Sequence, residues 1–399
     1  MATTVTAAHI TTLHLRAEMD PLEQRSALSP PTAKALLEAG YHVHIEHSRR
    51  RIYGDKAFQE VGARIVAEGS WVTAPADHII IGLNQLPSEP HLLRHTHIHF
   101  GNCYNRQDGW SDYLGRFVDG GGKLYDLECL TDDAGRRVVS FSYWAGFAGA
   151  ATALLAWSHQ LLHPAVLLRP LSPLRYPWAL CLAEDVSSSV SVAIERNSYP
   201  PPQVVVLGAN TLCGMGALGL CRAVGIIPPQ FILERDVNEV LTGGPFSEIP
   251  TSDVLINCLD LCPRFYPPVL EERTLSHPGR TLSVISDPTS GCGILTCPYS
   301  PIDVDVEQSE YSGLNQPSTV SIPLGGDGPP LTVVNYDPLP NLVARDASND
   351  FSLQLLPALL TLNKRETEPV WTRAEQKFQD VVKLLLWSKN VRATRTGHL

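Results

Sequence analysis

Residues 203–236 constrain the fold more than any other stretch of the chain. Four apolar residues, Val204 to Leu207, end at Gly208, and a helical run rich in alanine, leucine and glycine follows. A second apolar run then leads to Asp236. In dinucleotide sites with this strand–turn–helix–strand order, the helix N-terminus holds the pyrophosphate, and the acid accepts hydrogen bonds from the adenosine ribose. The stretch therefore predicts a Rossmann-type nucleotide site.

The glycine pattern of this candidate site is imperfect. The dinucleotide fingerprint has glycine two residues after Gly208 and again three residues further on. Those positions hold Asn210 and Cys213, with Gly214 just beyond. Asparagine tolerates a left-handed backbone, so the tight turn is still compatible with this sequence. The same residues would equally suit a parallel α/β turn that binds no ligand.

Apolar strands alternate with helical stretches along the rest of the chain, which predicts parallel sheets with helices on both faces. We expect an α/β fold with two Rossmann-like domains. A long helix lined with glycine and alanine at 143–162 is expected to link the domains or to pack between them. Residues 288–330 are dense in glycine, proline and serine, which predicts a long irregular loop over a site. Further strands are expected at 12–15, 41–45, 64–66, 77–83, 97–100, 123–127, 253–258, 282–286 and 331–334, and further helices at 30–40, 58–63, 179–195, 351–363 and 370–389.

Composition excludes several classes of partner. The chain has 399 residues and a net charge of −10, which argues against a nucleic-acid or anionic-membrane surface. It has no secretory signal pattern and no apolar run long enough for a membrane span, so we expect a cytoplasmic protein. Nine widely spaced cysteines form no CxxC pair and no Cys/His ligand array, so no metal site is predicted.

Many segments together resemble the fungal saccharopine dehydrogenase (NAD+, L-lysine-forming) family. The resemblance implies reversible oxidative deamination, in which a secondary amine joining two amino acid moieties is oxidised by NAD and then split by water. It also implies a monomer with an active-site cleft between two domains, one of residues 1–140 plus 331–399 for substrate and one of residues 141–330 for NAD. The matching segments include LHLRAE at 13–18, PLEQRSALSP at 21–30, GSWVTAPADHIIIGL at 69–83, LYDLE at 124–128, GRRVVSF at 135–141, WAGFAGAA at 144–151 and GGPFSEIP at 243–250.

The groups that bind substrate carboxylates in the family match residues of this chain. Arg25 stands at the family's substrate arginine, and Arg137 is the second arginine of its GRR motif. Glu128 keeps the acid after LYDL, which in the family modulates nearby proton transfer. A lone surface arginine is usually only a solvated charge, but these two lie inside matching motifs. Arginine binds carboxylates through two parallel hydrogen bonds, which suits an amino acid substrate.

The family's proton-transfer residues are replaced. Asn84 stands where the family has lysine, and Asn102 stands where it has a catalytic histidine. Neither amide carries a proton at ordinary pH. His97 and His99 lie close by with strand spacing, so both are expected to point to one face. Either could replace the missing base, although a strand histidine is more often packed in a core than catalytic.

Other substitutions affect the substrate and cofactor sites. Tyr143 precedes AGFAGAA and adds aromatic bulk, which predicts a larger or more apolar substrate than saccharopine. Asp236 retains the ribose acid, and Asp287 approximates an acid on the nicotinamide side in the family. Thr211, Leu212 and Thr242 replace a glycine and two arginines, so NAD binding is expected to be weakened or lost. Cys213 and Cys258 match a pair beside the family's cofactor, and two buried thiols are expected rather than a disulfide.

Three functions are compatible with this pattern. The first is a divergent NAD-dependent oxidoreductase that acts on the C–N bond of an amino acid conjugate or imine, in specialised metabolism rather than lysine biosynthesis. The second is a non-redox enzyme that condenses, cyclises or hydrolyses a small amine or 2-oxo acid in the same cleft, with NAD absent or structural. The third is a non-catalytic binding protein. Lysine biosynthesis is the least compatible enzyme function, because each lost acid–base residue contributes about 10²–10⁴-fold to rate.

Overall fold

The chain divides into two compact units, Met1–Ser140 with Ala347–Leu399, and Phe141–Asp346. The second unit therefore extends past the expected boundary at residue 330. Strand β12 (Leu331–Asn335) explains the difference, because it pairs in parallel with β10 (Val284–Ser286) of the second sheet. In this computed structural model the described residues are 10–104, 109–164, 166, 168–169, 171–172, 175–226, 230–231, 246, 248–259, 275–288, 318–322, 328–335 and 338–396.

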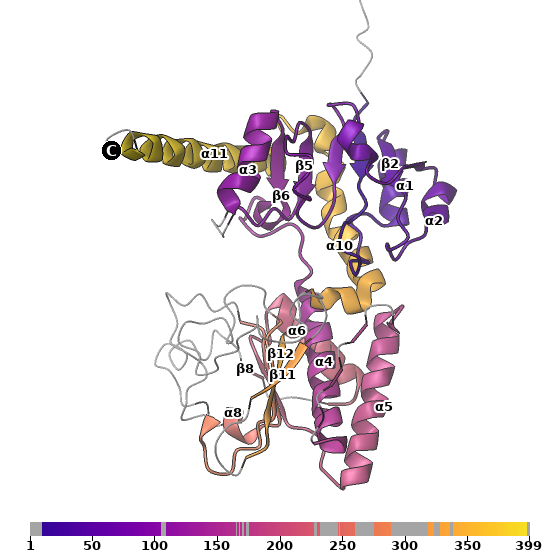
Figure 1. Cartoon of the computed structure of the whole chain (residues 1–399). Coiled ribbons are helices and arrows are strands. Elements are labelled where there is room, and N and C mark those ends of the chain that lie inside the picture. The colour runs from indigo at the N-terminus through magenta and orange to yellow at the C-terminus, as the bar shows by residue number, and fades with distance from the viewer. Residues whose placement is uncertain are drawn as a thin grey trace, which may run out of the picture. The chain divides into compact units, whose positions relative to one another are not determined.

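The first unit contains a six-stranded sheet in the order β3-β2-β1-β4-β5-β6, and every strand pair is parallel (Figure 1). Strand β1 lies at the centre. The chain adds β2 and β3 on one side of it and β4, β5 and β6 on the other, so the strand order switches between β1 and β4, as in doubly wound α/β folds. The strands are β1 (Thr12–Leu15), β2 (His42–Glu46), β3 (Arg64–Val66), β4 (Ile79–Ile81), β5 (Thr96–His99) and β6 (Lys123–Asp126). The helices are α1 (Pro30–Glu38), α2 (Asp55–Glu60), α3 (Trp110–Gly120), the later part of α10 (Ala344–Leu359) and α11 (Pro369–Thr396), with short 3-10 helices at Ser70–Thr73, Leu127–Cys129 and Leu362–Lys364.

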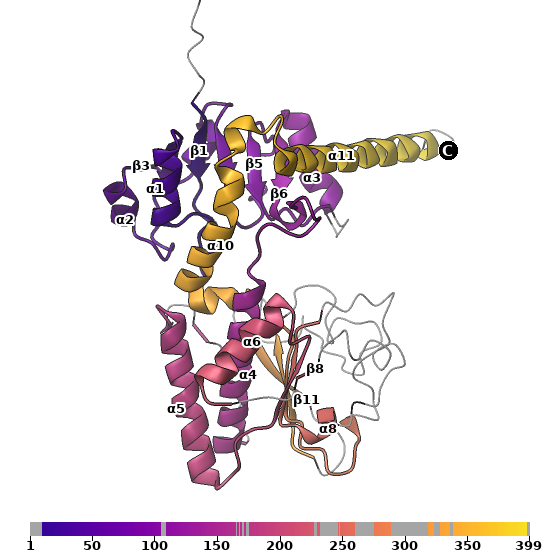
Figure 2. The ribbon, with the colours of Figure 1, turned by 180° about the vertical axis from the view of Figure 1, so that it is seen from behind.

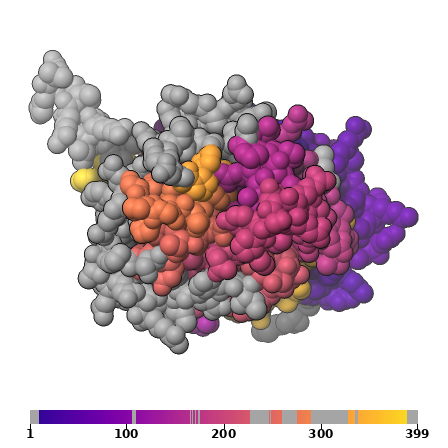
Figure 3. Space-filling view, turned by 90° about the horizontal axis from the view of Figure 1, so that it is seen from below, coloured from indigo at the N-terminus to yellow at the C-terminus, as the bar shows by residue number. Residues whose placement is uncertain are grey.

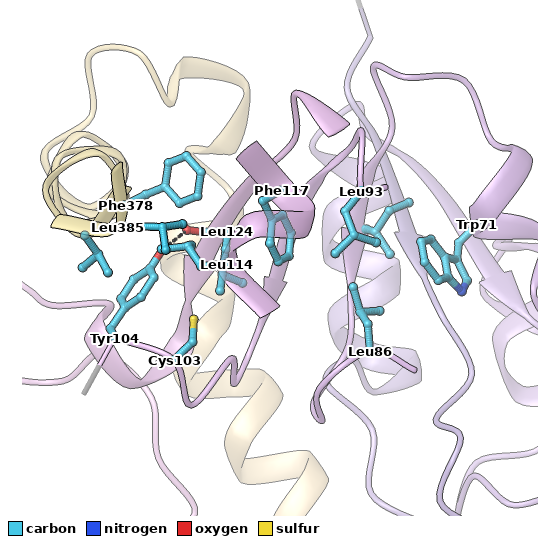
Figure 4. Close-up of a cluster of buried hydrophobic side chains, with 12 residues drawn as sticks. Trp71, Leu86, Leu93, Cys103, Tyr104, Leu114, Phe117, Leu124, Phe378 and Leu385 are labelled. Carbon is cyan, nitrogen blue, oxygen red and sulfur yellow. Dashed lines mark hydrogen bonds between the residues drawn. The ribbon is translucent and has the colours of Figure 1, made fainter. Parts of the chain in front are cut away.

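Helices cover both faces of this sheet. On one face, Phe117 of α3 and Phe378 of α11 belong to a buried cluster with Leu124 of β6 (Figure 4). On the other face, Phe351 of α10 packs against Phe100, with ring centroids 6.0 Å apart. The segment 347–396 thus completes the core that the first 140 residues begin.

The second unit holds another six-stranded sheet, in the order β11-β12-β10-β9-β7-β8. Strand β11 is antiparallel to β12, so residues 318–322 form an edge strand where an irregular loop was expected. The remaining pairs are parallel. The elements are β7 (Val204–Leu207), β8 (Gln230–Phe231), β9 (Val254–Asn257), β11 (Ser318–Ile322), α4 (Ser142–Leu162), α5 (Ala179–Asn197), α6 (Leu212–Ala223), α8 (Glu248–Thr251) and a 3-10 helix at Leu339–Val343.

Helix α4, which was expected to link the domains or to pack between them, belongs to the second unit and packs against its sheet and helices. It lies along α6 and α5 on one side of the sheet (Figure 2), and α5 covers part of the unit's surface (Figure 3). Its contact with α6 depends on glycine in both helices. A Cβ added at Gly146 would overlap the carbonyl oxygen of Cys213, and one added at Gly216 would overlap that of Tyr143. The α/β fold with two Rossmann-like units is confirmed. Among the described helices, none is both long and apolar enough to cross a membrane.

Candidate active site

The candidate site of the first unit lies where its parallel strands end. Because these strands run in the same direction, the residues that follow them meet at one edge of the sheet, which is the usual ligand-binding edge of such folds. Asn84 follows β4, Asn102 follows β5, and Glu128 follows β6. The loops after β4 and β5 are joined directly, since Gln85 Nε2 donates to the carbonyl oxygen of Gly101 at 2.6 Å.

Arg25 and Asn84 share one buried carboxylate. Arg25 donates to Glu23 through Nε at 2.9 Å and Nη2 at 2.6 Å, and Asn84 Nδ2 donates to Glu23 Oε2 at 3.0 Å. Burial by itself would raise the pKa of Glu23, but the charge of Arg25 and these hydrogen bonds hold it below its ordinary value. Glu23 is therefore an anion that positions the Arg25 guanidinium, and the Asn84 amide contributes a neutral donor to the same carboxylate.

A small pocket opens beside this network. Its charged lining comprises three arginines and two glutamates, namely Arg16, Arg25, Arg51, Glu18 and Glu23. One positive charge is thus in excess. Burial lowers the pKa of Arg51, and its Nη1 is buried with no acceptor in the part of the chain that the structure describes. A pocket of this kind suits a substrate carboxylate, because guanidinium donors bind planar anions through paired hydrogen bonds.

Arg51 is a pocket residue that the sequence analysis did not identify. It ends the run Arg49-Arg50-Arg51, which follows the carboxyl end of β2 by a few residues. Its Nη2 donates to the carbonyl oxygen of Glu46 at 2.9 Å, which holds the side chain toward the sheet edge. A cationic run just after a parallel strand was the available signal, although sequence alone does not show which of its members is buried.

Glu128 and Arg137 form an ion pair between Glu128 Oε1 and Arg137 Nη1. Both side chains are roughly one-third exposed, at 40% and 32%. Thr131 and Arg137 also form an isolated antiparallel bridge, which fixes the loop that carries the arginine. The structure thus brings together two residues that the sequence analysis selected separately.

A buried acid lies two residues before Glu128, at the end of β6. Asp126 ends β6, is 3% exposed, and accepts a hydrogen bond from the backbone N–H of Glu128 at 3.0 Å. Burial raises its pKa to about 6, although backbone hydrogen bonds from Glu128 and Gly101 oppose the shift. Asn102, one residue beyond Gly101, is exposed and left-handed, with φ of 49°. Asp126 is therefore a buried acid with a pKa of about 6 beside the loop that carries Asn102, and the sequence patterns did not point to it.

The free energy of unfolding of Asp126→Asn, relative to that of the unsubstituted protein, is expected to rise as the pH rises. The folded state binds the Asp126 proton more tightly than the unfolded state, where the ordinary value of 3.8 applies. Its contribution to stability is therefore full below about pH 4 and is lost as the pH rises through about 6. Between pH 4 and pH 8 the difference in unfolding free energy should shift by about 2.5 kcal/mol in favour of the variant.

Urea denaturation at several pH values measures this shift. Asp119→Asn, at an exposed position of α3, controls for the general loss of one negative charge. A difference between Asp126→Asn and the unsubstituted protein that does not change with pH would contradict the assignment.

His97 and His99 lie on one face of the sheet, as predicted, and both pack against Phe117. Both are 0% exposed, and burial lowers the pKa of each well below its usual range. Both nitrogens of His97 are buried without a partner among the described residues. These rings are neutral core side chains, so their environment does not support the hypothesis that one of them serves as a solvent-accessible base.

The turn after β7 has the geometry of a dinucleotide loop in two respects. Gly208 has φ of 70°, and a Cβ there would lie 2.8 Å from the carbonyl oxygen of Cys258. Gly214 packs against the turn so closely that a Cβ would overlap the carbonyl oxygen of Gly208. Gly208 and Gly214 thus meet two of the fingerprint's requirements, namely the tight turn and close helix–strand packing. Asn210 is exposed and does not take the left-handed conformation that the sequence suggested.

Thr211 caps helix α6. Its Oγ1 accepts the backbone N–H of Gly214 at 2.9 Å and donates to the carbonyl oxygen of Gly208 at 2.8 Å. The side chain therefore occupies one of the amide donors that a pyrophosphate would otherwise use. Leu212, where the family has an arginine, is 52% exposed.

Cys213 and Cys258 are both buried, and their side chains are in contact. Burial, followed by the Cys213 thiol, raises the pKa of Cys258 well above its usual range. Asp287 follows β10 and accepts a hydrogen bond from Asn257 Nδ2 at 3.0 Å. Tyr143 lies on α4, and its hydroxyl is close to Gly219 of α6, so its ring lies over the helix that the turn begins. Asp236 and Thr242 lie outside the described residues.

Comparisons with known proteins agree with this arrangement. Residues 14–148 match the model of the "Alanine dehydrogenase/PNT, N-terminal domain" family. Saccharopine dehydrogenase (NAD+, L-lysine-forming) of Yarrowia lipolytica is 45% identical over 366 residues, covering 92% of this chain and 96% of that protein. The Neurospora crassa protein of the same name is 42% identical over 94% of this chain and 97% of its own length.

Solved structures agree with the fold. An L-alanine dehydrogenase superposes with a TM-score of 0.63 at 16% identity, covering 93% of this chain and 99% of that chain. A transhydrogenase from Sinorhizobium meliloti superposes with a TM-score of 0.56 at 15% identity over 91% of this chain. At such identities these structures support the fold alone. Together with the near full-length sequence matches, they lead to one assignment: the chain belongs to the saccharopine dehydrogenase (NAD+, L-lysine-forming) family.

Proposed function

We propose that this protein is an NAD-dependent oxidoreductase that acts on the C–N bond of an amino acid conjugate or imine. The observation that carries the proposal is the buried pocket at the carboxyl edge of the first sheet, where Arg16, Arg25 and Arg51 outnumber Glu18 and Glu23. The guanidinium groups of this pocket suit a small carboxylate, because they can donate paired hydrogen bonds to it. Family membership then supplies the reaction type, because the relatives are named for NAD-linked formation of L-lysine from saccharopine.

The residues of the second unit fit NAD, with weakened phosphate contacts. Gly208 and Gly214 provide the tight turn, and the 12-residue helix α6 provides an N-terminus that favours an anion. We expect these residues to hold the pyrophosphate, with Asp236 toward the adenosine ribose and Asp287 toward the nicotinamide. When bound, NAD supplies hydride acceptance from the carbon next to the nitrogen. Thr211 competes for one amide of the turn, and Leu212 brings no charge to the phosphates.

Asparagine at the two positions where the family has its proton-transfer residues favours a substrate that needs little proton transfer from the protein. Asn84 and Asn102 can orient a substrate by hydrogen bonds, but they cannot take up a proton near neutral pH. Reduction of a preformed iminium requires no acid, because hydride addition alone gives the amine. Asp126 is buried and has a pKa of about 6, so it can gain or lose a proton close to physiological pH. We therefore favour a specialised pathway over lysine biosynthesis, with Tyr143 adding bulk that suits a larger or more apolar substrate, and we place the protein in the cytoplasm as a monomer.

A non-redox enzyme is the second candidate, and the Thr211 cap favours it. If the Gly214 amide stays occupied by Thr211, the charged pocket can still bind a substrate for condensation, cyclisation or hydrolysis. A non-catalytic binding protein would use the same pocket with no turnover. The three candidates differ in whether NAD binds and is consumed.

NADH binding discriminates between these functions. Titration of NADH fluorescence with the purified chain is expected to give saturable binding, and Leu212→Arg should tighten it by about 10-fold or more, because one charge-assisted contact contributes about 1.5–3 kcal/mol. Met215→Arg is the matched control, since Met215 lies on the same helix and is similarly exposed, at 45% against 52%. Absence of binding up to millimolar NADH, in the unsubstituted protein and in Leu212→Arg alike, would exclude the oxidoreductase.

A further inference from the structure

Three histidines meet on one face of the first sheet. His14 and His44 are paired neighbours on β1 and β2, and His78 immediately precedes β4, the strand on the other side of β1. One ligand atom from each ring lies within 4.8 Å of the others. The three residues come from separate motifs at least 30 positions apart, so only the sheet order brings them together.

His14 is oriented by a carboxylate. Its Nε2 lies 3.2 Å from Glu46 Oε1, and its Nδ1 is buried with no hydrogen-bond partner among the described residues. Glu46 is itself fixed by the backbone N–H groups of Ala17 at 2.9 Å, Gly69 at 3.0 Å and Trp71 at 2.7 Å. An acceptor of this kind places the imidazole proton on Nε2 and leaves the Nδ1 lone pair available. The same carboxylate–histidine arrangement orients metal-bound histidines in many proteins.

His78 and His44 are also suited to coordination. His78 Nδ1 is a second buried nitrogen without a partner in the described part of the chain. His44 is the register partner of His14 in the parallel β1–β2 pair, so both rings lie on the same face of the sheet. Neutral imidazole is the form that binds metal ions. Of the charged groups that influence the cluster, Asp77 favours a cation beside His78, and Arg64 opposes one beside His44.

We propose that His14, His44 and His78 form a binding site for a divalent transition-metal ion of the Zn²⁺ class, with Glu46 as the positioning residue behind His14. Three imidazoles with water in the fourth position are a known ligand set for Zn²⁺. Tetrahedral coordination at the usual Zn–N distances needs nitrogens about 3.3 Å apart, so each ring must rotate or shift by about 1 Å. The sequence does not reveal this site, because the site contains no cysteine and its histidines follow no local ligand motif.

The competing explanation is a packed cluster of neutral rings. Their centroids lie 5.2–6.0 Å apart with interplanar angles of 50–72°, which is ordinary aromatic packing. Packing alone accounts for the ring contacts. It does not account for the convergence of one ligand nitrogen from each of three rings within 4.8 Å, beside a carboxylate-bound ring.

Metal titration of the full-length chain tests the proposal. After chelation and removal of the chelator, Co²⁺ is added and its visible d–d absorption is followed, and Zn²⁺ is then added to displace it. We expect one ion per chain, loss of that ion in His44→Gln and in His78→Gln, and binding weakened by about 10–100-fold in Glu46→Gln. His91→Gln, at an exposed loop position of the same unit, should bind as the unsubstituted chain does.

Two results would overturn the proposal. One is the absence of saturable Co²⁺ or Zn²⁺ binding by the folded chain. The other is binding that persists in both His44→Gln and His78→Gln but disappears in His163→Gln, which would assign the ion to the His159–His163 pair on and next to α4, whose ring centroids lie 4.9 Å apart. Thermal unfolding of each variant without metal checks that it is folded, so lost binding is not mistaken for lost structure. The readout is metal content, so it does not depend on the proposed enzymatic function.

Discussion

The double variant Asn84→Lys, Asn102→His is expected to oxidise saccharopine with NAD at least about 10²-fold faster than the unsubstituted chain, because each acid–base residue contributes about 10²–10⁴-fold. The structure favours both changes. Asn84 Nδ2 donates to Glu23 Oε2, so a lysine ammonium at this position gains a buried carboxylate partner. Asn102 is exposed with φ of 49°, a conformation in which histidine is enriched among non-glycine residues. The initial rate of NADH formation at saturating substrate measures the gain.

The controls separate proton transfer from packing. Asn84→Met with Asn102→Gln makes comparable changes in size but adds no titratable group, so it should leave the rate unchanged. If the Lys/His variant binds NADH but stays inactive on saccharopine, then the substrate pocket has changed as well, and Arg51 and Tyr143 become the first positions to examine. If it does not bind NADH, the defect lies in the turn that Thr211 caps.

Gly216→Ala is expected to lower the free energy of unfolding by about 3 kcal/mol, the upper part of the usual range for overpacking a core. A Cβ at this position would overlap the backbone carbonyl of Tyr143, and backbone cannot rotate away as a side chain can. Helices α4 and α6 must therefore separate, which exposes apolar surface along their contact. Urea denaturation followed by circular dichroism gives the change in unfolding free energy.

Gly219→Ala is the matched control for this effect. It lies one turn further along the same helix, and a Cβ added there would lie 2.6 Å from the Tyr143 hydroxyl, the far end of a side chain that can move. Alanine favours a helix over glycine by about 1 kcal/mol, so this variant should be neutral or slightly more stable. Equal destabilisation by both substitutions would show that the backbone contact at Gly216 is not the cause.

Local sequence patterns predicted most of the fold. The apolar runs at 12–15 and 204–207 are the strands β1 and β7, and the Gly/Ala-lined stretch at 143–162 is helix α4 with one added residue. Features that depend on distant pairing were missed. Strand β11 lies in a stretch whose composition is typical of loops, and only its antiparallel pairing with β12 defines it. Helix α3 was also not predicted, although its signals are local, namely an amphipathic pattern between the capping glycines Gly109 and Gly121.

The candidate site was predicted to a lesser degree. Motif comparison selected Arg25 and Asn84, and the structure shows that both bind Glu23. It did not select Arg51 or Asp126, because their importance follows from burial, which one sequence does not reveal. The same limit affected His97 and His99, whose strand spacing was predicted but whose complete burial was not. The residues of this site follow different strands, and they meet only because those strands are neighbours in the sheet. Strand order depends on the whole chain, so no single stretch of sequence predicts the site.

The first unit is built from two separate segments of the chain, so it cannot complete its core until the C-terminal segment has been synthesised. Residues 141–346 are made between its two segments, and the core face that contains Phe117 and Leu124 is closed by Phe378 and Leu385 of α11. At about 5–20 residues per second, the intervening unit takes roughly 10–40 s to translate. The second unit, whose chain is continuous, can therefore reach its native fold on the ribosome before the first does, while the unfinished N-terminal sheet exposes an apolar face to chaperones.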